Sequence, residues 1–187
     1  MMRHPANILR RFVASTRGVA AIEFAMIMPV LSIMFLASFD GGRAIAAYMK
    51  VRAATYALAA ITNQYSTIQT SDMTSIVGAA ATVMAPYATT SSNPVITISQ
   101  IAISSTGKAT ISWSYSQGGT ARSSITLPAT ALDINSSYLI LAEVSYTFTP
   151  LFGFFTAGAL TLSDNLYVTP RVSNCINYST VTSCVTG

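Results

Sequence analysis

Residues 19–39 read VAAIEFAMIMPVLSIMFLASF, an apolar run of 21 residues in which Glu23 is the only charged side chain. As a helix this run is about 31 Å long at ~1.5 Å per residue, enough to cross the hydrocarbon core of a bilayer. The sequence therefore predicts a single membrane-spanning helix. Pro29 removes the helix hydrogen bond back to Ala25, so we expect a bend or a local loosening at this position.

The charge distribution agrees with a membrane-anchored chain. Only 9% of the residues are charged and the mean hydropathy is +0.51, values expected of a protein that is partly embedded in lipid. The net charge of +4 comes from four arginines before the apolar run, because the six remaining basic residues balance the six acidic ones. These four are Arg3, Arg10, Arg11 and Arg17. The rest of the chain has no basic cluster, which argues against a nucleic-acid partner.

The same arginines predict the orientation of the chain. Basic residues before a span favour a cytoplasmic N-terminus, and Arg43, Lys50 and Arg52 after it weaken this asymmetry without reversing it. We therefore expect the remainder of the chain to face outward, away from the cytoplasm.

The helix is expected to continue past the span to about Ile61, because the segment RAIAAYMKVRAATYALAAI is rich in alanine. One face of this continuation repeats at steps of three and four residues and suits packing along another helix. Its members are Ile45, Tyr48, Arg52, Tyr56 and Ala59. A stalk that packs only on its own domain is an equal alternative.

The rest of the chain predicts a small module of class α+β. The segment SDMTSIVGAAATVM indicates a second short helix with Ser71 as N-cap, ending before Pro86. Four stretches then favour antiparallel strands: PVITISQIAIS, KATISWSYSQ, SYLILAEVSYTF and LTLSDNLYV. The second strand precedes a turn at Gly118-Gly119 and is expected to alternate with one apolar face, formed by Ala109, Ile111, Trp113 and Tyr115. In the first and last strands the alternation slips, near Gln100 and Asp164.

The two cysteines, Cys175 and Cys184, are expected to form a disulfide if the module lies in an oxidising compartment. The alternative is a pair of free buried thiols. His4 is the only histidine, so no zinc site is predicted.

The remaining chemistry argues against an enzyme. The six carboxylates stand one at a time along the sequence, and there is no phosphate-binding loop or nucleophile elbow. We therefore expect no catalytic residue, no metal and no cofactor.

Glu23 needs its own explanation, because an ionised carboxylate in a membrane span is costly and usually marks a function. A basic leader ends at Gly18, Glu23 is the fifth residue after it, Phe24 follows, and an apolar helix continues. This order of features favours proteolytic processing of the leader. A simple signal anchor, with Glu23 at the level of the lipid headgroups, is the alternative.

Residues 17–59, RGVAAIEFAMIMPVLSIMFLASFDGGRAIAAYMKVRAATYALA, resemble the N-terminal segment of the TadE/TadG-like proteins of bacterial tight-adherence (Flp-type) pilus systems. The distal stretches AEVSYTFTPLFGFF and LTLSDNLYVTPR are also similar to the C-terminal part of that family. The resemblance implies a minor pilin, or pseudopilin, of the inner membrane. On this likeness Gly18 precedes the prepilin peptidase cut, Val19 is the new N-terminus, and Glu23 serves processing or assembly.

The resemblance also implies partners: prepilin peptidase, other major and minor pilins, the inner-membrane assembly platform and membrane lipid. Major pilins of these systems are much shorter and carry Tyr after the glutamate, where this chain has Phe24 and a long appended module. A minor, priming or tip role is therefore expected.

We accordingly divide the chain into a basic leader at 1–18, a transmembrane and assembly helix at 19–61, and an extracytoplasmic module at 62–187. The expected function is that of a non-enzymatic component of a tight-adherence pilus or a related type II secretion machine. An uncleaved membrane-anchored adhesion or binding protein is the main alternative. A secreted protein is the third, but the span exceeds a signal-peptide core of about 7–15 residues.

Overall fold

A long helix, a short helix and a four-stranded sheet make up the computed structural model, which describes residues 18–87, 89–127, 135–153, 158–179 and 184. The elements in chain order are α2 (Val19–Thr62), β1 (Thr67–Ile68), α3 (Thr70–Val83), β2 (Val95–Ile103), β3 (Ala109–Gln117), β4 (Ser137–Phe148), β5 (Leu160–Val168) and β6 (Asn177–Tyr178). This confirms the predicted α+β class with an antiparallel sheet. Of the predicted leader, only Gly18 lies among the described residues.

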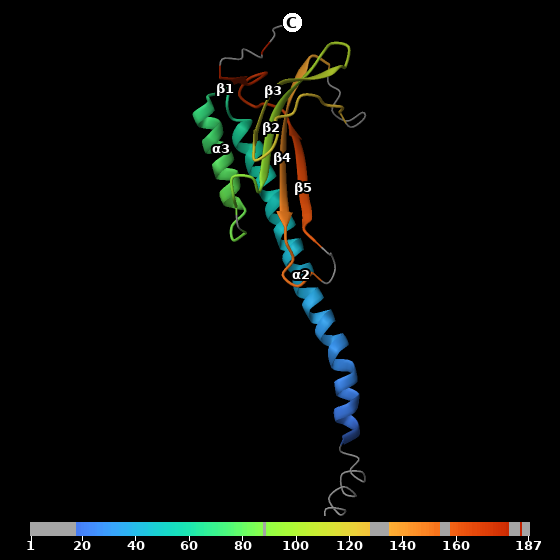
Figure 1. Ribbon diagram of the computed structural model, residues 1–187. Coiled ribbons are helices and arrows are strands. Elements are labelled where there is room, and N and C mark those ends of the chain that lie inside the picture. The colour runs from blue at the N-terminus through green and yellow to red at the C-terminus, as the bar shows by residue number, and fades with distance from the viewer. Residues whose placement is uncertain (1–17, 88, 128–134, 154–157, 180–183, 185–187) are drawn as a thin grey trace, which may run out of the picture.

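Helix α2 is continuous over 44 residues and runs through Pro29, Gly41 and Gly42 without interruption (Figure 1). Its alanine-rich second half has the high helix propensity needed to carry the helix past the glycine pair. The helix ends at Thr62, one residue beyond the predicted end. Its first half projects away from the rest of the molecule, and its second half lies against the sheet (Figure 1).

The main sheet is antiparallel with the strand order β3-β2-β4-β5. Helix α2 contacts β4 and β5, and α3 packs beside α2. The core between them contains Val51, Ala54, Leu58, Ile76, Val77, Ile96, Ile98, Ile140, Ala142 and Val144. The second half of α2 is therefore part of the module's core, although it precedes the chain division at residue 62.

A β-bulge in β3 changes the predicted face of that strand. Gln100 pairs with Trp113 but Ile101 pairs with Ile111, so Ser112 has no partner and the alternation of side chains reverses. Trp113 lies in the core beneath the helices, whereas Ile111 packs with Ile101 in a small cluster on the opposite face. The prediction of one shared apolar face in β3 was therefore wrong.

The break in side-chain alternation predicted near Gln100 in β2 does not come from a bulge in the pairing of β2 with β4. Strand β2 pairs with β4 in unbroken register, but its apolar residues change sides: Ile96 and Ile98 face the helices, while Ile101 and Ile103 join the opposite cluster. No comparable irregularity occurs at Asp164, because β5 pairs with β4 without a register shift.

Helix α3 begins earlier than predicted. Its N-cap is Gln69, not Ser71, and the Gln69 backbone N–H donates to Asp72 Oδ2 at 2.9 Å. A carboxylate at this third helical position satisfies an N–H that the helix itself leaves free. The predicted turn at Gly118 is present, with φ +79°, and a Cβ there would lie 2.8 Å from Ser92 Cα. Only glycine fits that turn.

Candidate functional site

The first half of α2 is an unpaired apolar surface. Its most hydrophobic window has no residue buried within the described chain, and by length and composition the helix could cross a membrane. The large side chains that it exposes are Val19, Ile22, Phe24, Met26, Ile27, Met28, Val30, Leu31, Ile33, Met34, Phe35 and Phe39. A continuous apolar surface of this extent needs lipid or other helices around it.

The predicted processing residues lie at the start of this surface. Gly18 is the N-cap of α2 and Val19 its first residue, and both are exposed. Glu23 is four residues after Val19 and therefore on the same helix face. Glu23 and Phe24 are exposed, and no ion pair or hydrogen bond to the Glu23 carboxylate is found within the described part of the chain.

Pro29 lies in the middle of the exposed half. Helix α2 continues through Pro29, and the next hydroxyl along it, Ser32 Oγ, donates to the Met28 carbonyl at 2.8 Å. The Ala25 carbonyl, which Pro29 deprives of its usual donor, belongs to the same exposed surface. A neighbouring helix or a local adjustment could satisfy it in lipid.

The second half of α2 has two distinct faces. Ala47, Val51, Ala54 and Leu58 are fully buried against the sheet and α3. On the predicted helix-packing face, Ile45, Tyr48, Arg52 and Tyr56 are exposed, but Ala59 is buried in the core. The helix thus packs on its own module with one face and leaves the other face open.

Asp40, which the sequence did not single out, joins the helix to a distant loop. Its side chain is only 4% exposed. Oδ1 accepts the Leu151 backbone N–H at 3.0 Å, and Oδ2 accepts those of Phe152 and Gly153 at 2.9 and 3.1 Å. Three charge-assisted hydrogen bonds compensate the carboxylate for the water that it loses. No sequence signal could have found this contact, because the partners are backbone groups more than a hundred positions away.

A polar hollow of about 580 Å³ lies on the sheet face opposite the helices. It is bridged by Arg122, whose guanidinium pairs with the Glu143 carboxylate through two hydrogen bonds. The hydrogen bond to Glu143 raises the pKa of Arg122. Burial, and then the Glu143 charge, raise the pKa of Tyr167 beside the pair. Thr97, Ser145 and Ser163 are among the other residues that line the hollow.

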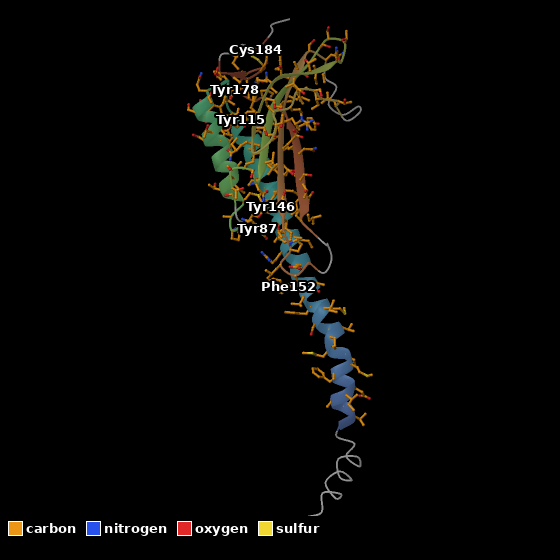
Figure 2. All side chains as sticks on the ribbon, viewed as in Figure 1. Tyr87, Tyr115, Tyr146, Phe152, Tyr178 and Cys184 are labelled. Carbon is orange, nitrogen blue, oxygen red and sulfur yellow. A yellow bond between two sulfur atoms is a disulfide. The ribbon has the colours of Figure 1, made fainter. Side chains whose placement is uncertain are left out.

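The C-terminal segment is fastened at the far end of the module from the projecting helix (Figure 2). Cys175 and Cys184 form a disulfide with their Cα atoms 5.8 Å apart. Trp113 Nε1 donates to the Ile176 carbonyl at 2.8 Å, and the Ile176 N–H donates to Gln100 Oε1 at 2.7 Å. The disulfide was expected from the sequence, but the packing and the hydrogen bonds that also hold Ile176 were not.

Titratable groups are dispersed over the described parts of the chain. No group of three or more His, Cys, Asp or Glu side chains is close enough there to hold a metal ion.

Comparison with known proteins concerns the long helix. A family model described as "TadE-like protein" matches residues 18–60. No curated protein and no solved structure matches the chain. The family match does not extend to the sheet module, so the likeness of its distal stretches stays a prediction. Residues 18–60 are thus similar to TadE-like proteins, which confirms the resemblance over this segment and supports a component associated with tight-adherence pili.

Proposed function

We propose that the protein is a minor pilin-like component of a tight-adherence pilus or a related type II secretion machine. Prepilin peptidase removes the leader after Gly18, and the mature chain is assembled through α2 with other major and minor pilins at the inner-membrane platform. The N-terminus faces the cytoplasm, and the module faces the periplasm or the pilus surface. The protein has a structural role and no catalytic one.

The observation that carries this proposal is the exposed first half of α2 within a TadE-like segment. The main core cluster of the described module takes from α2 only residues of its second half, from Ala44 onward. A helix half that lies outside this cluster and exposes most of its large apolar side chains is suited to lipid first and to neighbouring helices afterwards. Storage in a membrane followed by assembly requires both environments.

Glu23 gives the assembly its register. Cleavage after Gly18 creates a positive α-amine at Val19, in apolar surroundings. An amine on one subunit and a carboxylate on its neighbour offset each other's loss of hydration when the helices pack. The open position of Glu23, one helical turn from Val19, leaves it available for such a partner.

Cross-linking in cells tests the proposal. A photo-reactive residue in place of Met26, which is 75% exposed on the span, should form adducts with other pilins. The same residue in place of Val51, which is fully buried, should give none and serves as the matched control. Adducts with lipid alone at position 26, in cells that assemble pili, would refute assembly through α2.

The polar hollow favours a second candidate, an uncleaved membrane-anchored binding protein. Its hydroxyl groups and the Arg122–Glu143 pair could receive a polar surface ligand. In that case the chain would keep its leader, and α2 would tether the module without contacting other pilins. Full-length chain in the membrane together with the absence of pilin adducts would favour this candidate.

A further inference from the structure

The loop between β4 and β5 is held at one level along α2. Its described residues are 149–153, which read TPLFG, and 158–159. Three consecutive backbone N–H groups of this loop donate to Asp40, so the loop lies beside the residue that follows the apolar run. This contact places the loop where the helix leaves the module (Figures 1 and 2).

Two large apolar side chains of this loop, Leu151 and Phe152, are exposed. Leu151 is 64% exposed and Phe152 is 43% exposed. The Phe152 ring packs edge-on against Phe39, with 6.2 Å between the ring centroids, and Phe39 itself is 48% exposed. Leu151, Phe152 and Phe39, here called the junction patch, therefore continue the apolar surface of the span onto the module.

A positive charge stands just above the junction patch. The Arg43 guanidinium carbon lies 5.9 Å from the Phe39 ring centroid and 5.8 Å from that of Phe148. Arg43 is four residues beyond Phe39, about 6 Å further from the apolar run at ~1.5 Å per residue. Aromatic rings beneath a cation are the arrangement that membrane proteins place between hydrocarbon and lipid phosphates.

We propose that the junction patch inserts into the membrane interface on the module's side of the bilayer, as a second anchor beside α2. The occupant of the patch is lipid: acyl chains against Leu151 and Phe152, and phosphate groups beside Arg43. Its continuity with the apolar surface of α2 and the position of Arg43 support lipid over a protein partner. This inference rests on the proposed membrane span of α2.

A second anchor would restrict the orientation of the module on the membrane, which a single helix does not. A single span allows the module to rotate and tilt on the membrane, since tilt is set by interfacial anchors and neighbours. The loop is clamped to α2 by a buried carboxylate, so its insertion fixes the depth of Phe39 and the direction in which the sheet faces. The chain would then present the outer face of α2 in one orientation to an arriving subunit.

Quenching of a fluorescent label by brominated lipid tests the inference. Leu151→Cys is labelled in the full chain, without reductant, and reconstituted in vesicles of phosphatidylcholine and phosphatidylglycerol with brominated acyl chains. Met34→Cys in the span is the positive control. Ser105→Cys, exposed in the hairpin after β2 at the opposite end of the sheet, is the negative control.

We expect loss of emission at positions 34 and 151 and none at position 105. Adding Asp40→Asn, which replaces one acceptor oxygen by a donor, should reduce quenching at 151 and leave it unchanged at 34. Quenching at 34 without quenching at 151 would overturn the junction patch while leaving the proposed function intact. Absence of quenching at both would overturn the span as well. Shielding of position 151 only when other chains are added would also overturn the inference, in favour of a protein contact.

Discussion

At the scale of single residues, Glu23 combines a free-energy cost of membrane insertion with a proposed role in assembly. An ionised carboxylate at the centre of a span costs about 2.5–3.5 kcal/mol on insertion scales, and less near the edge. Within the described chain no group offsets this cost for Glu23. The sequence therefore retains a side chain that opposes membrane residence, which is understandable if a partner subunit compensates it.

Replacing Glu23 by alanine should separate insertion from assembly. Glu23→Ala removes a polar group from an exposed apolar surface, so the span should insert at least as well as in the wild type. Co-isolation with other pilins should fall, because their N-terminal amines lose their partner. Membrane fractionation and affinity isolation measure the two effects. Ser32→Ala, also in the span, is the control that should change neither, and unchanged co-isolation of Glu23→Ala would rule out the inter-subunit role.

Gly18 should matter to the peptidase and not to the fold. A Cβ at this position would meet no atom within 4 Å, so Gly18→Leu should leave α2 and membrane insertion intact. Processing should nevertheless stop, and the full-length chain should accumulate on immunoblots of the membrane fraction. Gly41→Ala, where a Cβ is equally unhindered, should be processed normally. Normal cleavage of Gly18→Leu would show that the cut lies elsewhere.

At the scale of elements, local patterns predicted most of the architecture. The alanine-rich segment after the span predicted that α2 continues to about Ile61. Period-two alternation, interrupted near Gln100 and Asp164, indicated all four strands of the main sheet. The errors came from interactions that a local pattern does not contain. The bulge at Ser112 depends on pairing with β2, and the cap of α3 depends on Asp72 reaching back to Gln69.

Short elements and long-range contacts could not be predicted from the sequence either, because no local pattern marks them. The parallel pair β1–β6 joins two residues from each end of the module, too few to show a period. The Asp40 clamp uses backbone donors, which every residue but proline carries. Gly18, Val19, Glu23 and Phe24, in contrast, were singled out from their linear order in the sequence and from the resemblance to TadE/TadG-like proteins, and their roles stay predictions.

The two faces of α2 should respond differently to truncation. Leu58 is fully buried in the core, so Leu58→Ala should lower the free energy of unfolding by about 2–5 kcal/mol through lost burial and a cavity. Ile45 is 61% exposed, and Ile45→Ala should change the free energy of unfolding by no more than about 0.5 kcal/mol. Denaturant unfolding of the detergent-solubilised chain measures both. Equal effects would contradict the packing of α2 on the sheet.

At the scale of the whole molecule, α2 connects three environments. Its first half is exposed and apolar, Asp40 clamps it to a loop at the junction, and its second half completes the core (Figure 1). The disulfide lies at the end of the module farthest from the span (Figure 2). Burial of the second half in the sheet fixes the module to the helix, so forces on one are transmitted to the other.

The disulfide reports on the side of the membrane that the module occupies. A loop of about ten residues gives roughly 2.5–3 kcal/mol of stabilisation by chain entropy. A periplasmic module should form the bond, whereas a cytoplasmic one should keep both thiols reduced. Alkylation of the denatured, unreduced protein from cells should therefore label neither Cys175 nor Cys184, and reduction should release both. Labelling before reduction would contradict the proposed orientation.

The N-terminus of the mature protein tests the central claim most directly. Intact mass spectrometry of the membrane-extracted chain, from cells with an active prepilin peptidase, should give the mass of a protein that begins at Val19. The same measurement in cells without the peptidase should give the full-length chain beginning at Met1, which excludes cleavage by another protease. Recovery of only the full-length chain from peptidase-positive cells would contradict the account and favour the uncleaved membrane-anchored protein.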